Sequence, residues 1–192
     1  MKKIYILLVL LPLYSSAQNI NSFAGVNFGL SKDEAIKTIS NTGAVVNRID
    51  EGEELVYLTN LKLAGVDSKL LYMKFINDKF YEAIVEFEVN QSNFMQLFNL
   101  FKTRLIGSYG YGKDFSWLDT PYYFGDGQEF IALAKRKGKL CHAWGNPKNI
   151  TSGNFVSIEV CADRTLRLLY RSHDLALIAS KKGSTPTFSS NY

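Results

Sequence analysis

The strongest candidate nucleophiles, bases and metal ligands in this chain are two histidines and two cysteines. His142 directly follows Cys141, but neighbours along a strand point to opposite faces, so these two residues do not form a catalytic dyad. Apolar residues lie two positions to either side of His142, which indicates a histidine packed on a sheet face. His173 and Asp174 lie where a helix could begin, and we interpret them as capping and solvated residues. We therefore predict no catalytic residue, no metal site and no cofactor.

Three glutamates, Glu82, Glu86 and Glu88, share one face of a segment with a period of two. Carboxylates on one face could act as general acid and base or could bind calcium. We favour exposed glutamates on the solvent side of an amphipathic strand, because the intervening positions are mostly apolar. No G-x-S-x-G turn occurs in the chain. A glycine-rich stretch at 107–112 follows a predicted helix, which indicates a helix stop and a turn and not a phosphate-binding loop.

An aromatic segment at 109–124 is the feature with the clearest binding chemistry. Its rings alternate with glycine, serine, aspartate and one proline, and six of them are our candidate binding residues: Tyr109, Tyr111, Phe115, Trp117, Tyr122 and Tyr123. Tyrosine and tryptophan combine apolar area with a polar group, which suits partner surfaces, and the turn-rich context favours a loop. The alternative, which we favour, is that these rings and Phe124 cover the open end of the sheet as a satellite core.

Charged residues near this segment leave two further readings open. Asp114, Asp119 and Asp126 lie among the rings, and an acid beside sugar-stacking aromatics would be the signature of a glycan hydrolase. Aspartate is equally common in turns. The cations Lys135, Arg136, Lys137 and Lys139 could attract an anionic surface, but we interpret them as a solvated hairpin tip.

The N-terminus predicts export. Lys2 and Lys3 precede an apolar stretch at 4–13, and small residues occupy 15–17, so residues 1–17 read as a signal peptide with Gln18 as the mature N-terminus. The apolar stretch is about half the roughly 20 residues that cross a bilayer, and we predict no transmembrane segment. We expect a periplasmic or secreted protein.

Composition of the expected mature chain is that of a folded, nearly neutral domain. Removing the two leader lysines from 22 basic residues leaves 20 against 18 acidic ones, which gives no support for nucleic-acid binding.

Because paired cysteines of exported proteins tend to be oxidised, we predict a disulfide between Cys141 and Cys161. Two buried free thiols are the alternative, since a sequence does not supply the Cα separation that a disulfide requires.

Two helices and two groups of strands must position these residues. A capping box at Ser31 and Glu34 begins the first helix, and aromatic residues at helical spacing predict a second helix from about Asn90 or Ser92 to Ile106. Strands are predicted at 55–63, 70–76 and 81–89 between the helices, and at 129–135, 139–144, 155–161 and 165–171 after them. Residues 172–182 predict a short terminal helix and 183–192 a disordered tail.

This order predicts one α+β domain over 18–182, with an antiparallel sheet of meanders and two helices packed on one of its faces. The layout resembles the exported β-lactamase-inhibitor-like and SmpA-like modules. The matching residues are the capped helix start at 28–35, Phe-Gly-Leu-Ser-Lys-Asp-Glu-Ala, and the stretch at 105–110 after the second helix. The resemblance implies a non-catalytic module that binds proteins or takes part in envelope assembly, although here a strand, and not a second helix, follows the first helix.

We therefore expect an exported, non-enzymatic binding protein whose partner is a protein or another envelope component. Two alternatives stay open at this point. One is the hydrolase of an envelope glycan, and the other is a surface structural protein that self-assembles through exposed sheet edges.

Overall fold

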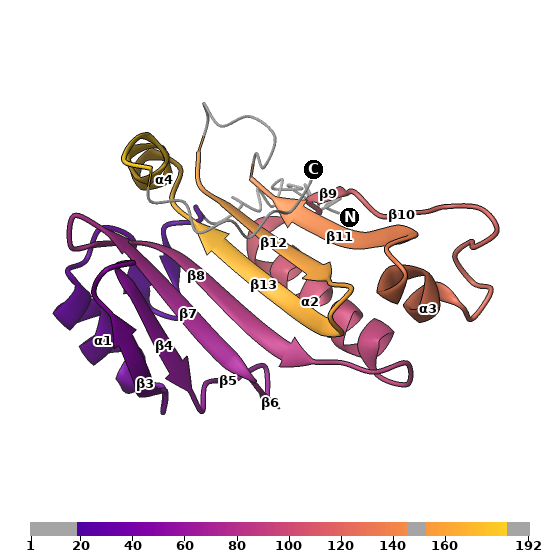
Figure 1. The fold of residues 1–192 in the computed structure, drawn as a ribbon, viewed down its shortest axis with the longest axis horizontal. Coiled ribbons are helices and arrows are strands. Elements are labelled where there is room, and N and C mark those ends of the chain that lie inside the picture. Colours follow the sequence, from indigo (N-terminus) through magenta and orange to yellow (C-terminus); the bar gives the residue numbers. More distant parts are fainter. Residues whose placement is uncertain (1–18, 146–152, 184–192) are drawn as a thin grey trace, which may run out of the picture.

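A computed structural model describes residues 19–145 and 153–183 of the chain. The predicted signal peptide and residues 184–192 of the predicted tail lie outside the described residues. The α+β class is confirmed, because this part of the chain contains four helices and a large antiparallel sheet (Figure 1). The element order differs from the predicted alternation, since a short hairpin, β1 (Ser22–Phe23) and β2 (Val26–Asn27), precedes the first helix.

The sheet is continuous and runs in the order β10-β11-β12-β13-β8-β7-β4-β3, with β9 also paired to β11. Its N-terminal strands are β3 (Val45–Asp50), β4 (Leu55–Thr59), β7 (Leu70–Ile76) and β8 (Lys79–Glu88). Its C-terminal strands are β9 (Lys113–Asp114), β10 (Trp117–Leu118), β11 (Gly138–Trp144), β12 (Phe155–Val160) and β13 (Thr165–Arg171). A separate hairpin joins β5 (Lys62–Leu63) to β6 (Val66–Asp67).

The pairing of β8 with β13 joins the two groups of strands into one sheet. The register places Leu166 opposite Phe87 and Leu168 opposite Val85, and all four side chains are buried. They belong to a core that extends from the β1–β2 hairpin to β11. Burial of this apolar surface on both sides of the β8–β13 junction stabilises the whole sheet.

Two helices contribute buried side chains to this core. Helix α1 (Lys32–Ser40) begins with the predicted capping box, and Ala35 and Ile39 are buried on its inner face. Helix α2 (Phe94–Tyr109) contributes a row of rings, of which Phe101 packs on Phe87 with 4.6 Å between ring centroids. The helix continues through the predicted stop at 107, and Gly110, with φ of 81°, follows its last residue.

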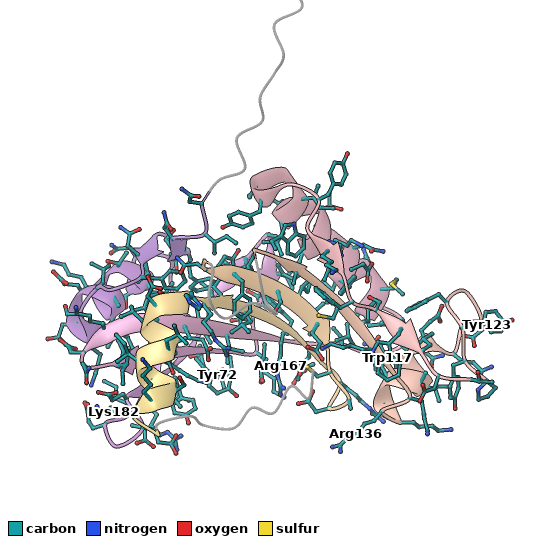
Figure 2. The ribbon with its side chains drawn as sticks, turned by 90° about the horizontal axis from the view of Figure 1, so that it is seen from above. Tyr72, Trp117, Tyr123, Arg136, Arg167 and Lys182 are labelled. Carbon is teal, nitrogen blue, oxygen red and sulfur yellow. The ribbon has the colours of Figure 1, made fainter. Side chains whose placement is uncertain are left out.

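Helix α4 (His173–Lys181) confirms the predicted terminal helix. It packs against a second, smaller cluster in which Ala179 contacts the buried side chains of Ile76 and Tyr81. Figure 2 shows this helix, in yellow, on the side of the sheet away from α2. The sheet is therefore covered on both faces at the end of β7 and β8.

The predicted strand at 129–135 is wrong, because these residues form helix α3 (Glu129–Ala134). A short apolar run does not distinguish a buried strand from a buried helix by its period. Alanine and leucine favour helix, and Ala132 and Leu133 are buried. Phe130 packs on Phe94 of α2 with ring centroids 5.2 Å apart, which fixes α3 against the start of that helix.

The prediction of three exposed glutamates is also wrong, since only Glu88 is exposed. Glu82 is 1% exposed and pairs with Lys74 (2.7 Å) and Arg171, which lie opposite it on the two neighbouring strands. Glu86 is 6% exposed and pairs with Arg167 at 2.9 Å. Each buried carboxylate thus has a cation within ion-pair distance, as burial of a charge requires.

The predicted disulfide is absent, because Cys141 and Cys161 are free cysteines in the structure. The residue opposite Cys141 is Glu159, so Cys161 lies one diagonal step away, just beyond the end of β12. Diagonal neighbours in a sheet have Cα atoms roughly 7–8 Å apart, beyond the reach of an unstrained disulfide. Burial raises the pKa of each thiol to about 12, which keeps both of them protonated.

Candidate binding surface

The aromatic segment lies along β11, at the end of the sheet opposite to α1. Strand β10 pairs with the start of β11, where Trp117 is opposite Lys139 and Leu118 is opposite Gly138. A side chain at Gly138 would not fit, because a Cβ there would lie 2.3 Å from Leu118 Cδ2 and 2.8 Å from the Trp117 carbonyl oxygen. The glycine at 138 therefore permits the close pairing of β10 with β11.

Half of the candidate rings are packed against the fold. Tyr109 lies edge-on to Tyr170, with 6.5 Å between the ring centroids. Phe115 is half-buried below the Lys113 ammonium group, 5.4 Å from the centroid of its ring. Tyr122 is half-buried and accepts a hydrogen bond on its hydroxyl from Lys135 Nζ at 3.3 Å. These three residues fit the satellite-core interpretation.

The other rings contradict that interpretation, because they are exposed to solvent. The exposed fraction is 86% for Tyr111, 66% for Tyr123, 48% for Phe124 and 47% for Trp117. Tyr111 is separate from the others, since it lies by the end of α2, where its carbonyl oxygen is 2.7 Å from Nε2 of the buried His142. Figure 2 shows Tyr123 at one end of the molecule, with Trp117 and Arg136 in the same half but nearer the middle.

Two carboxylates, Asp126 of the loop between β10 and α3 and Glu129 at the start of α3, bind the backbone on either side of Phe124. Asp126 accepts backbone hydrogen bonds from Tyr123 (3.1 Å) and Gln128 (2.7 Å), and Glu129 accepts one from Gly125 at 2.7 Å. A loop whose backbone donors are satisfied by its own side chains needs no core contact for its rings. The exposure of Tyr123 and Phe124 is therefore a property of an ordered loop.

Cations from two distant parts of the chain lie near α3. Lys135, Arg136 and Lys137 follow α3, and Arg164 lies in the turn between β12 and β13 with φ of 64°. We call these four cations, with Trp117, Tyr123, Phe124 and the exposed Ile131, the aromatic–basic surface. Within the described part of the chain, none of the four cations lies within ion-pair distance of a carboxylate. Lys139, the other cation of the predicted cluster, pairs with Glu159 at 3.7 Å instead.

An open depression of about 440 Å³ lies next to this loop. Phe130, Ile131 and Ala134 of α3 supply its apolar lining, and Lys135, Arg164, Asn90 and Gln91 supply its polar lining. No carboxylate lines this depression. A lining that combines apolar and cationic side chains is suited to a ligand with an apolar part and a negative charge.

The three aspartates of the hydrolase alternative are dispersed or engaged. Asp114 lies opposite His142, whereas Asp119 lies beside Lys137, roughly 16 Å farther along β11 at the usual rise per residue. Glycosidase carboxylates lie about 5–9.5 Å apart, so these two do not form such a pair. Asp126 holds the loop, and none of the three lines the depression.

The neighbours of Asp114 favour its ionised form. Burial alone would raise its pKa, but hydrogen bonds from Ser116 and the charge of Lys102 lower it below its ordinary value. A carboxylate stabilised in its ionised form is a poor general acid near neutral pH. His142 is 5% exposed and packs on Trp144 with ring centroids 4.7 Å apart, which confirms its predicted place on a sheet face.

Sequence reasoning missed Ile131 and Arg164 as members of this surface. Ile131 belongs to the predicted strand at 129–135, and Arg164 follows the aromatic segment by about forty positions without any motif. Only the pairing of β12 with β11 and β13 brings Arg164 to α3. No local signal in the sequence could have found it.

Comparisons with known proteins gave no match, whether to protein-family models, to curated proteins or to solved structures. In the described ranges, no helix is long and apolar enough to cross a membrane. No group of three or more histidines, cysteines or carboxylates in those ranges could hold a metal ion.

Proposed function

We propose that this protein is an exported, non-enzymatic binding protein that recognises an envelope component through the aromatic–basic surface. The observation that carries the proposal is the exposure of Trp117, Tyr123 and Phe124 toward one end of a fold that has a large core available for such rings. Exposed aromatic residues surrounded by arginine and lysine are typical of recognition surfaces. The resemblance to exported envelope-assembly modules also favours such a role.

Catalysis receives less support from the same geometry. The candidate acids Asp114 and Asp126 are engaged in hydrogen bonds that hold β9 and the loop. Catalytic carboxylates need a pKa matched to proton transfer and a cavity that brings substrate to them. The depression beside the loop presents cations and amides in place of acids.

Affinity capture from an envelope fraction tests the proposal. The mature protein, starting at Gln18 and tagged at its C-terminus, is compared with Tyr123→Ser/Phe124→Ser. The matched control is Val45→Ser/Ile49→Ser, which removes two exposed apolar side chains, 52% and 42% exposed, from the opposite edge of the sheet. We expect at least ten-fold lower recovery of envelope material with the loop variant and unchanged recovery with the control. Equal recovery with all three proteins would refute the role of the loop.

Self-assembly is a second candidate, favoured by one observation. Strand β3 is an edge strand that exposes Val45 and Ile49, and exposed edges can pair with another chain. A register shift between Val46 and Arg48 interrupts this edge, which disfavours extended pairing. Light scattering of the mature protein distinguishes the two candidates. If the protein assembles through β3, its molar mass in solution should rise with concentration, and Ile49→Lys should have a lower molar mass than the unaltered protein.

A further inference from the structure

We infer that the partner of the aromatic–basic surface is an anionic lipid surface. In this inference Tyr123 and Phe124 enter the headgroup region and Lys135 and Arg164 bind lipid phosphate. The inference rests on the proposed function and names the partner of the same surface. Three features support it: the position of the loop, the availability of the cations and the chemistry of the depression.

The loop between β10 and α3 lies at one extreme of the longest axis of the molecule (Figure 1). Side chains at an extreme can meet a flat surface without movement of the backbone. Tyr123 and Phe124 are the exposed rings of this loop. Tyrosine and tryptophan prefer the water–lipid interface, because each combines apolar area with a polar group. The loop is thus placed and composed for interfacial contact.

The cations of this surface are available to an external anion. Lys135 donates to the hydroxyl of Tyr122, and Arg136 and Lys137 lie in the exposed turn before β11. Asp163, the chain neighbour of Arg164, is occupied by Arg167 at 2.7 Å. Asp126 and Glu129 lower the local charge, but their oxygens accept backbone hydrogen bonds within the loop. Each lysine or arginine near an anionic bilayer strengthens binding about five-fold.

The depression explains how a single lipid would be held. Its lining includes the cations Lys135 and Arg164 together with the apolar side chains of Phe130, Ile131 and Ala134. Lysine and arginine are the usual partners of phosphate groups, and the apolar side chains suit the first part of a lipid chain. Lys135 also contacts Tyr122, so the depression and the aromatic loop belong to one continuous surface.

Vesicle binding tests the inference with the full mature protein. Vesicles of phosphatidylcholine alone are compared with vesicles that also contain phosphatidylglycerol, by co-sedimentation and by tryptophan fluorescence. Only two tryptophans occur in the chain, and Trp144 is 1% exposed whereas Trp117 is 47% exposed. A blue shift on binding therefore reports Trp117, and Trp117→Phe should abolish the shift. We expect binding only to the anionic vesicles, with weaker binding at high salt.

Variants separate the two parts of the surface. Lys135→Ser and Arg164→Ser should each weaken binding about five-fold. Tyr123→Ser/Phe124→Ser should weaken it at least ten-fold, at unchanged melting temperature. Lys37→Ser, which removes an exposed cation from α1 without touching this surface, is the matched control and should bind normally. Inorganic phosphate should compete poorly, because it lacks the apolar part of the ligand.

The outcomes distinguish this inference from the proposed function. Loss of vesicle binding in the loop and cation variants, with Lys37→Ser unaffected, supports the lipid partner. Failure to bind anionic vesicles, combined with envelope capture that still depends on Tyr123 and Phe124, overturns the lipid partner and leaves a protein or glycan partner. Efficient competition by inorganic phosphate also overturns it, in favour of a small free anion. Loss of both activities refutes the proposed function as well.

Discussion

Glu82 is a single residue whose cross-strand neighbours allow it to be buried, although the spacing of its sequence pattern predicts exposure. Its period-two spacing with Glu86 and Glu88 is typical of a solvated strand face. In the sheet, however, Lys74 of β7 and Arg171 of β13 lie opposite it, and the carboxylate is almost completely buried. The identity of these partners depends on strand pairing, which no local period encodes.

The Glu82→Gln variant should be destabilised by about 3 kcal/mol, because it leaves Lys74 buried without this charged partner. Urea unfolding of the mature protein measures the loss. Glu88→Gln is the matched control. Glu88 lies on the same strand face, is exposed, and pairs with Lys69 at 3.6 Å. Its loss should stay within about 0.5 kcal/mol. Similar losses in both variants would contradict a buried ion pair at Glu82.

The candidate binding residues form two groups, one packed within the fold and one exposed to solvent. Tyr109 and Tyr122 have ring or hydroxyl contacts within the fold, whereas Trp117 and Tyr123 extend into solvent. Residue type identified all of them as amphipathic rings, which suit either location. Their locations depend on hydrogen bonds of the loop backbone with Asp126 and Glu129, and on the short pairing of β10 with β11.

At the scale of elements, α1 was the best-predicted helix, because its start depends on local chemistry alone. Ser31 Oγ accepts a hydrogen bond from the Glu34 backbone and donates one to the Glu34 carboxylate at 2.7 Å. The capping box satisfies backbone donors that a helix start leaves free. By contrast, the segment of α3 is predicted as a strand, because the period of a short apolar run does not distinguish a buried strand from a buried helix.

Removal of the Ser31 cap by Ser31→Ala should lower the free energy of unfolding by about 1 kcal/mol at pH 7. The hydrogen bonds with Ser31 lower the pKa of Glu34 below 4.5, so the ionised form favours the folded state above that pH. This contribution is lost as the pH falls through the folded-state pKa, so the difference in stability between Ser31→Ala and the unaltered protein should be smaller when measured at pH 3 than at pH 7.

Thermal melting at both pH values checks this prediction. Ser40→Ala, at the exposed last position of α1, is the control and should melt like the unaltered protein at either pH. A penalty for Ser31→Ala that does not change with pH would show that Glu34 takes no part in the cap.

At the scale of the whole molecule, the β8–β13 junction determines how the chain behaves. The strand groups before and after α2 share one sheet and one core, and Phe87 and Leu166 lie at the centre of their contact. Units that share a core are expected to unfold together. The predicted single domain over 18–182 can therefore be tested through cooperativity.

Unfolding in urea should give one transition with the same midpoint by far-ultraviolet circular dichroism and by tryptophan fluorescence. Circular dichroism reports both strand groups, whereas the fluorescence change comes mainly from the buried Trp144 of β11. Leu168→Ala should move both midpoints together and cost about 2–5 kcal/mol, because its side chain is buried at the junction. Separate midpoints for the two signals would show two independent units.

Local patterns in the chain were enough to predict the α+β class, the capped helix, most strands and the amphipathic character of the 109–124 segment. These features depend on side-chain periodicity and on interactions within a few residues. The ion pairs of Glu82, the free state of Cys141 and Cys161, and the approach of Arg164 to α3 depend on which strands pair and in what register. Contacts between residues distant in the chain follow from burial of the shared core, and only the folded sheet reveals them.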